Sequence, residues 1–390
     1  MNQISRFAHQ YYTGSTPEDI KTYNQQLLAY IQTTLLPFPD PQREPTMQLA
    51  DIIGQQGVAE IISNNSISFH TVGDTGHENG LMQELVAKAM TQDYDISNPG
   101  KSPAFFLHLG DVIYFDNTDK GYQAQFYVPY KKYPGKIIAI PGNHDGEIFK
   151  YDGTPTGQKT SLAAFWRNFC QPVSGVPADA GTILREMVSQ PGAYWYLDAP
   201  FIDIVGLYSN IAEGPGFINV PTLGGIKQID WLTKTLLQIE EKRKQGIRKA
   251  LIIVVHHPPF SYGGHSSSVE MLADIDNCCT QAGLLPDAVI AAHAHNYQRF
   301  TRYTSVNGQN VQTPYFVVGT GGRGIVNVPP ANGTRIGDHS FESSLMGYGY
   351  LTVTATAQNL TLFFTHVDLN GLKSPFDKKI VVNLTSPTLL

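Results

Sequence analysis

The feature of this sequence that most constrains its fold is a series of ten short β-rich runs that begins at Ser66. Each run is rich in apolar residues and is bounded by turn formers, which is the pattern of a buried strand. Helical runs such as LMQELVAKAMTQ and QIDWLTKTLLQIEEKRK fall between several of them. This alternation predicts an α/β protein with sheet inside and helices outside. The ten runs are SISFHTVGD, AFFLHLGD, KIIAIPGNHD, FIDIVGLYS, KALIIVVHHP, AVIAAHAH, TPYFVVGTG, YGYLTVTAT, NLTLFFTHV and KKIVVN.

Two segments do not follow this alternation. Residues 1–65 are predicted to form a helical N-terminal appendage, in which PFPDPQREP separates the amphipathic run KTYNQQLLAYIQTTLL from a second helix. We assign the remainder, residues 66–390, to one domain. Within that domain, residues 146–191 contain the helical piece SLAAFWRNFC but little strand character. We therefore expect residues 146–191 to form a cap or rim insertion.

Composition narrows the class of partner. The net charge is -6, so the chain lacks a broad basic field for nucleic acid, and no run of about 18 apolar residues predicts a membrane span. We therefore expect a small, mobile substrate. The first residues, MNQISRFAHQYYTGS, lack the basic and apolar regions of a secretory signal. This predicts a cytoplasmic protein, or a periplasmic or secreted one if the natural chain carries a leader; the oligomeric state is not indicated.

Five of the predicted strands end in polar residues of a particular kind. Ligands of open α/β sheets bind just beyond the carboxyl ends of the strands, so we expect these side chains to gather on one edge of the sheet. They offer carboxylate, amide, phenol and imidazole donors and no thiolate, a set that suits iron, manganese or catalytic zinc better than structural zinc. The five strand ends are GDTG (73–76), GDVIY (110–114), GNHD (142–145), VVHHP (254–258) and AHAH (292–295).

These five motifs, in this order, resemble those of the calcineurin-like metallophosphoesterases, and within that superfamily those of the purple acid phosphatase branch. The branch pattern runs GDxG, GDxxY, GNH followed by D or E, VxxH and GHxH, and the resemblance covers Ser66 to Asp368. The DxH motif of most other members of the superfamily is absent from this sequence, because Gly76 occupies the position at which DxH has its histidine. Ala292 replaces the first glycine of GHxH, a change that is harmless only if its backbone has negative φ.

The resemblance implies a four-layer α/β/β/α sandwich and two metal ions, Fe(III) and a divalent ion (Fe, Zn or Mn). Asp74, Tyr114 and His295 would hold the first ion, and Asp111 would bridge the two. The second ion would be held by Asn143, His256 and His293.

The activity that the resemblance implies is hydrolysis of phosphate esters by attack of metal-bound hydroxide, with phosphomonoesters as the expected substrates. His144 and His265 would contact the phosphoryl oxygens, and one of them would protonate the leaving group. Two alternatives stay open at this point. One is a phosphodiesterase of the same superfamily, and the other is a metal-binding module without catalysis.

Other residues near the motifs are open to simpler readings. His257 is expected to lie at the rim or to support the ligands from outside the metal centre. His108 is expected to be a hydrogen-bonded imidazole in the core or beside the ligands, and His77 to belong to the start of a helix. GTGGRG (319–324) matches the dinucleotide-binding pattern, but the residues after it, IVNVPP, cannot open the helix that this pattern requires. We expect a glycine-rich loop near the metal edge, with Arg323 able to meet a substrate phosphate.

Overall fold

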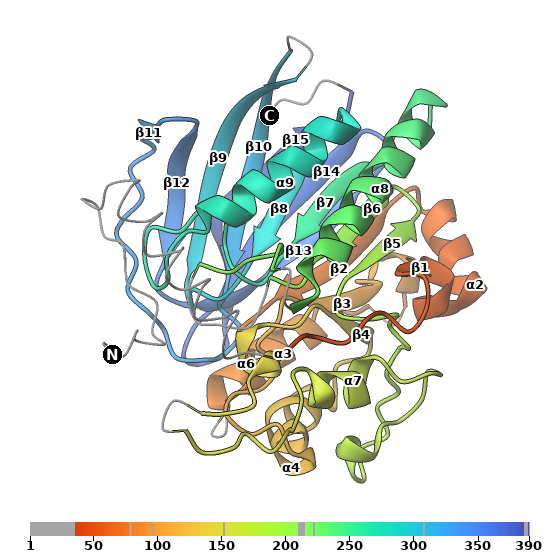
Figure 1. The fold of residues 1–390 in the computed structure, drawn as a ribbon, viewed down its shortest axis with the longest axis vertical. Coiled ribbons are helices and arrows are strands. Elements are labelled where there is room, and N and C mark those ends of the chain that lie inside the picture. Colours follow the sequence, from red (N-terminus) through yellow and green to blue (C-terminus); the bar gives the residue numbers. More distant parts are fainter. Residues whose placement is uncertain are drawn as a thin grey trace.

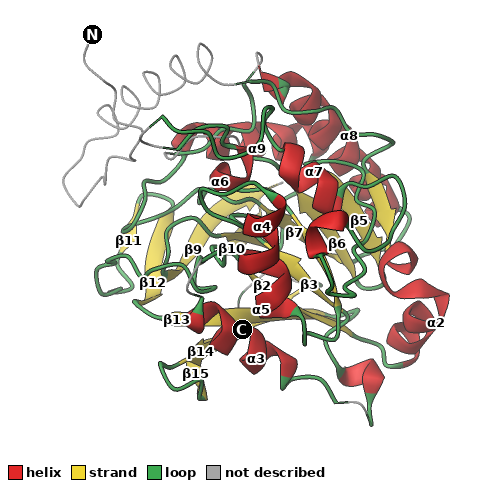
Figure 2. Ribbon diagram, turned by 90° about the horizontal axis from the view of Figure 1, so that it is seen from below, coloured by secondary structure: helices red, strands yellow, loops and turns green. Residues whose placement is uncertain are grey.

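The computed structural model describes residues 36–77, 80–95, 97–150, 153–209, 215–220, 223–306, 309–385 and 389. Two mixed sheets face each other, and helices cover the outer side of each sheet (Figures 1 and 2). In Figure 2 helices α8 (Gly225–Lys244) and α9 (Val269–Ala282) lie at the top and α3 (Leu81–Thr91) lies at the bottom. The predicted α/β sandwich is therefore confirmed.

The larger sheet has nine strands, of which β6, β7, β8 and β10 run parallel and the others pair antiparallel to their neighbours, except for the short parallel edge strand β1. In spatial order the strands are β1 (Thr46–Gln48), β5 (Trp195–Ala199), β6 (Ile202–Gly206), β7 (Ala250–Val254), β8 (Ala288–Ala291), β10 (Gln309–Val318), β9 (Tyr297–Val306), β12 (His339–Leu345) and β11 (Arg335–Ile336).

The smaller sheet has six strands. Its strands β2, β3 and β4 are parallel, and β13 pairs antiparallel with β2 to attach the C-terminal strands. The spatial order is β15 (Lys373–Asn383), β14 (Asn359–Val367), β13 (Tyr348–Ala355), β2 (Ile67–Val72), β3 (Phe105–His108) and β4 (Lys136–Ala139).

The helices outside the sheets are mostly short. The longest N-terminal one, α2, follows β1 directly, and α9 begins at the N-cap Ser268, whose side chain accepts a hydrogen bond from the Met271 amide. The remaining helices are α2 (Leu49–Ser63), α4 (Asp119–Tyr122), a π-helical turn (Gln123–Tyr127), α5 (Val128–Tyr130), α6 (Asn143–Gly146), α7 (Ala163–Phe169) and two 3-10 turns (Pro99–Lys101 and Ala178–Ala180). Among the described residues, no helix has the length and apolar character that a membrane span requires.

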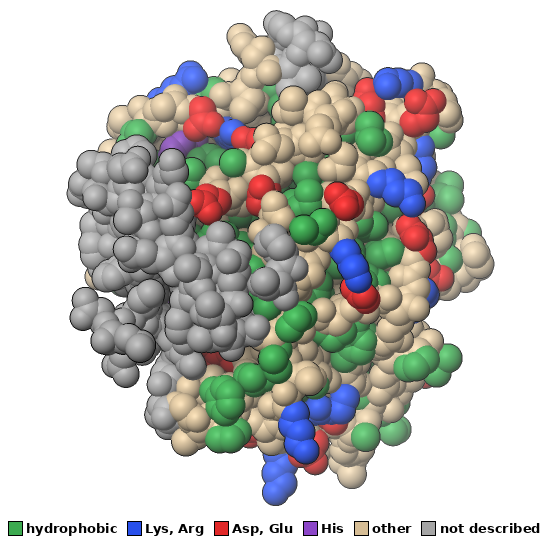
Figure 3. Space-filling view, in the orientation of Figure 1, with side chains coloured by type: hydrophobic (Ala, Val, Ile, Leu, Met, Phe, Trp, Pro, Cys, Tyr) green, Lys and Arg blue, Asp and Glu red, His purple; other side chains and the backbone are tan. Residues whose placement is uncertain are grey.

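The core lies between the two sheets, and the central parallel strands are also covered by helices on their outer side. Because both faces of these strands are buried, their sequences are continuous apolar runs. All five residues of β7, ALIIV, are buried. Tyr297 of β9 stacks on Phe364 of β14 with ring centroids 4.2 Å apart, and the indole of Trp195 donates to the Ala139 carbonyl at 3.0 Å. These contacts hold the ends of the strands in fixed positions. On the surface, acidic and basic side chains are interspersed over the face in Figure 3.

All ten predicted strands are present, whereas β1, β5, β9, β11 and β12 were not predicted. The N-terminal segment also differs from the prediction, because Thr46–Gln48 pairs with Tyr196–Asp198 and so joins the larger sheet. The predicted second helix corresponds to α2, and the run KTYNQQLLAYIQTTLL lies outside the described residues except for its last residue. The domain boundary at residue 65 and the cap role of residues 146–191 stay predictions.

Candidate metal centre

The five polar motifs lie at the carboxyl ends of strands from both sheets. Strands β2, β3 and β4 of the smaller sheet lead into GDTG, GDVIY and GNHD, while β7 and β8 of the larger sheet lead into VVHHP and AHAH. The prediction of one edge of a single sheet is wrong in this respect, because the motifs meet across the gap between two sheets. Backbone hydrogen bonds join them, such as Asp74 N–H to the Gly110 carbonyl at 3.1 Å.

The predicted ligands of the first ion converge on one point. The Tyr114 hydroxyl lies 3.0 Å from Oδ1 of Asp74 and 3.0 Å from Nε2 of His295, and these last two atoms are 3.4 Å apart. Tyr114 is 2% exposed and Asp74 is fully buried. Three donor atoms from three strand ends therefore form a closed triangle.

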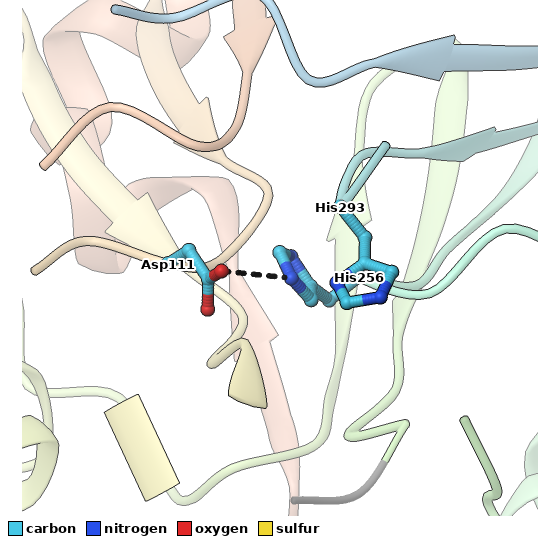
Figure 4. A group of neighbouring side chains, drawn as sticks. All are labelled: Asp111, His256 and His293. Carbon is cyan, nitrogen blue, oxygen red and sulfur yellow. Dashed lines mark ion pairs between the residues drawn. The ribbon is translucent and has the colours of Figure 1, made fainter. Parts of the chain in front are cut away.

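The predicted ligands of the second ion form a neighbouring group (Figure 4). Nε2 of His256 lies 3.1 Å from Oδ1 of Asn143 and 3.3 Å from Oδ2 of Asp111. His293 stands beside His256 with ring centroids 5.1 Å apart. Asp111, His256 and His293 are all buried, and each offers a ligand atom within 4.8 Å of the others.

Asp111 belongs to both groups. Its carboxylate lies within the same 4.8 Å limit of ligand atoms on Asp74 and His295, so the described residues hold two candidate metal-binding groups that share one carboxylate. The second oxygen of that carboxylate, Oδ1, accepts from the His144 amide at 3.0 Å, which orients it. A shared carboxylate is what a binuclear centre requires, since its charge offsets the repulsion between two cations.

The backbone at these positions is unusual. φ is +56° at Asp74, +53° at Asp111, +67° at His293 and +46° at His295. The left-handed region costs a non-glycine residue about 1–2 kcal/mol, and such conformations persist where the surrounding structure enforces them, often at functional sites. All four of these residues are predicted ligands, so the unfavourable backbone conformations gather at the candidate site.

Glycines next to these residues allow the close approach of the loops. A Cβ on Gly142 would lie 2.2 Å from Oδ1 of Asp111, and one on Gly73 would lie 2.6 Å from the Cβ of Ala292. Ala292 has a negative φ, so its replacement of the first GHxH glycine is harmless to the backbone. Gly73 supplies the space that the Ala292 methyl group occupies.

The electrostatics of the second group favour positive charge. Nδ1 of His256 lies 2.8 Å from the Leu109 carbonyl, to which its N–H donates, so Nε2 faces Asn143 and Asp111. Burial lowers the pKa of His256, but the negative charges on Asp111 and Asp74 outweigh burial and raise it to about 9. Burial and the neighbouring histidines hold the pKa of His293 well below its ordinary value, which keeps this imidazole neutral as a ligand must be.

The residues fit a pair of metal ions. Donor atoms bound at 2.0–2.2 Å to one ion are separated by about 2.8 to 3.6 Å for angles of 90° to 109°, and the distances of 3.0 to 3.4 Å in the two groups match this. Within the described chain, Nε2 of His293 is buried and has no hydrogen-bond partner, and the buried Oδ2 of Asp111 lies 3.3 Å from Nε2 of His256, another predicted ligand. A buried acceptor without a partner is costly unless a cation meets it.

The two predicted phosphate-contacting histidines flank these groups. Nδ1 of His144 lies 2.9 Å from Oε2 of Glu147, and its ring contacts Tyr114 at 4.4 Å between centroids. The His265 ring lies against His293, with centroids 4.1 Å apart. The structure therefore brings both histidines to the same place as the predicted ligands.

The other histidines and the glycine-rich loop can also be placed. Nδ1 of His108 accepts a hydrogen bond from the Gly110 amide at 3.2 Å, and its Nε2 lies 2.7 Å from Oγ1 of Thr75. Burial is the main cause that lowers the pKa of His108 to about 3, as expected of a neutral core imidazole. Of the two positions expected for His257, the structure shows the one beside the ligands: the side chain is buried, its Nδ1 lies 2.8 Å from Oγ of Ser209, and its ring contacts His293 at 4.2 Å between centroids. His77 precedes α3, whose N-cap is Gly80.

Two residues that orient the site were not predicted. The Gln125 side chain accepts from the Tyr114 amide at 2.8 Å and donates to the Tyr114 carbonyl at 3.0 Å, and Glu147 holds His144. Glu147 was visible in the sequence as the residue after GNHDG, three positions from His144. No local signal marks Gln125, because it reaches Tyr114 from the π-helical turn.

Comparisons with known proteins agree with this arrangement. A family model described as calcineurin-like phosphoesterase matches residues 67–297. Among solved structures, GAP50, titled the anchor in the inner membrane complex of Plasmodium, is 12% identical with a TM-score of 0.52 over 82% of this chain and 89% of that chain. PhoD is 12% identical with a TM-score of 0.49 over 90% of this chain and 73% of that chain. A dimetal phosphatase from Danio rerio is 10% identical with a TM-score of 0.44, over 82% of this chain and 99% of that chain. A search of curated proteins gives no match.

Proposed function

Because this chain belongs to the calcineurin-like phosphoesterase family, we propose that it is a metal-dependent hydrolase of phosphomonoesters, similar to the purple acid phosphatases. The observation that carries the proposal is the pair of buried ligand groups that share Asp111. Two adjacent cation sites are typical of hydrolytic phosphoesterases, in which two ions clamp the attacking and leaving oxygens.

Each proposed ligand follows from the contacts described above. Asp74, Tyr114 and His295 hold the first ion, and Asn143, His256 and His293 hold the second. A phenolate donor favours a trivalent ion, so we assign Fe(III) to the first position and a divalent ion, Fe, Zn or Mn, to the second. When bound, the ions supply Lewis acidity that lowers the pKa of a coordinated water and stabilises charge on the phosphoryl group.

The chain's own residues then orient the ester and move the proton. Oε2 of Glu147 lies 2.9 Å from Nδ1 of His144 and so fixes the orientation of the ring, and we assign His144 a contact with a phosphoryl oxygen. His265, packed on His293 at the other side of the centre, donates a proton to the ester oxygen as the bond from phosphorus to that oxygen breaks. The leaving group departs as a neutral alcohol, and His265 is neutral afterwards.

The direct test is hydrolysis of p-nitrophenyl phosphate and bis(p-nitrophenyl) phosphate by one preparation whose metal content is measured in parallel. The proposal expects about two ions per chain and a higher kcat/KM for the monoester. A higher kcat/KM for the diester would favour the phosphodiesterase alternative. Full metal content with neither ester hydrolysed would favour a non-catalytic module, a role compatible with the fold, since GAP50 is described as an anchor.

A further inference from the structure

The glycine-rich loop 319–324 is bound to the candidate metal centre by its backbone. The amide of Arg323 donates to the Asp74 carbonyl at 2.9 Å, and that of Gly321 donates to the Gly73 carbonyl at 3.0 Å. A Cβ on Gly319 would lie 2.6 Å from Oδ2 of Asp74, so this close approach requires glycine. The loop therefore carries the Arg323 side chain to the first group of predicted ligands.

The guanidinium of Arg323 lies over two aromatic rings of the site. Its central carbon is 4.3 Å from the centroid of the Tyr114 ring and 5.3 Å from that of Phe115. Phe115 in turn contacts His144 at 4.8 Å between centroids. The arginine side chain is thus placed beside the histidine to which we assign a phosphate contact.

Arg323 differs from every other arginine in the part of the chain that the structure describes. The side chains of the others each donate at least one hydrogen bond, for example Arg299 to Asp377 at 2.6 Å and Arg335 to the Gly337 carbonyl at 3.1 Å. The guanidinium of Arg323 makes no hydrogen bond or ion pair with any described residue, and it is only partly buried.

Stacking on a ring uses the face of a guanidinium and leaves its edge, with five N–H donors, available for a bidentate contact with phosphate. A phosphomonoester carries up to two negative charges near neutral pH, whereas a diester carries one. We propose that Arg323 binds a non-bridging phosphoryl oxygen of the substrate and selects the more highly charged monoester over the diester. This proposal rests on the phosphomonoesterase function proposed above.

The test compares Arg323→Met with Arg335→Met. Arg335 stacks on Tyr303 at the same distance, 4.3 Å, outside the candidate metal centre, so its variant controls for the loss of a stacked arginine. Hydrogen bonds to charged groups contribute about 1.5–3 kcal/mol, so Arg323→Met should lower kcat/KM for p-nitrophenyl phosphate about 10- to 100-fold. The loss for bis(p-nitrophenyl) phosphate should stay below about threefold, and Arg335→Met should change neither. Arg323→Lys should lie between wild type and Arg323→Met.

Calorimetry of inorganic phosphate binding to Mn²⁺-loaded protein separates this proposal from the proposed function. A phosphate Kd that rises about tenfold or more in Arg323→Met supports the role of Arg323, even if neither ester is hydrolysed. Absence of hydrolysis of both esters would overturn the proposed function but not the phosphate contact of Arg323. An unchanged phosphate Kd, or equal losses on both esters, overturns the role of Arg323 and leaves monoester hydrolysis by wild type intact. The thermal midpoint and metal content of both variants show that fold and ions are retained.

Discussion

Removal of the shared charge at Asp111 should weaken metal binding and lower the stabilisation that the metals give to the folded protein. Asp111→Asn keeps the shape of the side chain and an oxygen that accepts from the His144 amide, but it removes the one negative charge that the two ligand groups share. One substitution should therefore weaken two sites at once. The surface variant Asp40→Asn, which breaks only an exposed ion pair with Lys227, is the matched control.

The magnitude follows from ligand linkage. At a metal concentration 100 times Kd, each site stabilises the folded protein by about 2.7 kcal/mol, or about 5.4 kcal/mol for two sites. With an unfolding entropy of about 2.1 cal/mol/K per residue, the 337 described residues give roughly 0.7 kcal/mol/K. The metals should therefore raise the wild-type Tm by about 7 °C.

The variant should lose most of that shift. Even changes in residues that only orient metal ligands weaken affinity about 10- to 100-fold, and loss of a shared charged ligand should cost at least as much. Metal stabilisation then falls to between about 0.8 and 2.8 kcal/mol, and the Tm shift to about 1–4 °C. Scanning calorimetry with and without metal, together with elemental analysis, measures both quantities. A full shift and two retained ions in Asp111→Asn would refute the shared-carboxylate reasoning.

Four further predictions follow from the same structure. Gly142→Ala should lower metal content while Gly175→Ala should not. φ at Gly142 is -96°, but its new Cβ would lie 2.2 Å from Oδ1 and 2.4 Å from the backbone nitrogen of Asp111 and so displace the shared ligand, whereas a Cβ on Gly175 meets nothing within 4 Å; equal metal analyses would contradict this. His265→Ala should slow the hydrolysis of alkyl phosphates about 10²- to 10⁴-fold and the hydrolysis of nitrophenyl phosphate much less. The reason is that an alkoxide is a poor leaving group and needs a proton, whereas nitrophenolate leaves without one. Equal losses on both substrates would show that His265 only contacts the phosphate. Oxidised, iron-loaded protein should be coloured and Tyr114→Phe colourless in visible absorption, and a colourless wild type with ferric iron would exclude the purple assignment. Burial raises the pKa of Asp93, but the hydrogen bonds of its carboxylate with His70, Lys373 and Tyr350 outweigh burial and lower this pKa to about 2. The ionised carboxylate therefore stabilises the fold by about 1–2 kcal/mol above pH 3.8, and this stabilisation is lost as the pH falls through about 2. Urea unfolding should show Asp93→Asn less stable than wild type at pH 7, with the difference shrinking toward pH 2; a constant difference would argue against a charge effect.

The parts of the fold that could be predicted are those with a local signal. Buried parallel strands such as β7 read as continuous apolar runs that end at turn formers, so all ten predicted strands are present. The strands that were missed lack this signal. β9, YQRFTRYTSV, mixes arginine, threonine and tyrosine, and its arginines are accommodated only because Asp377, Asp276 and Asp338 pair with them in the folded protein.

The candidate site divides in the same way. The donor types and their order along the chain were visible, because each motif is a short string at the end of one strand. Their meeting point was not, because it depends on two separate sheets: the His293 amide donates to Asp74 at 2.6 Å across 219 residues of sequence. The sequence left two positions open for His257, at the rim or beside the ligands, and only the folded chain shows it buried next to Ser209, because a histidine next to a proline loop has no local signature of burial.

The sequence by itself determined which chemical groups end the central strands and hence the class of site, because apolar periodicity and turn residues act over a few neighbouring positions. The family resemblance implied that Asp111 bridges two ions, and the tertiary structure brings its carboxylate within reach of both ligand groups. Tertiary structure alone decided that the Arg323 guanidinium, without a carboxylate partner among the described residues, lies over Tyr114. It also decided the left-handed backbone at Asp74 and His295. These features arise from packing between segments far apart in the chain, where the contacts of one loop set the conformation of another, and local sequence carries no record of such contacts.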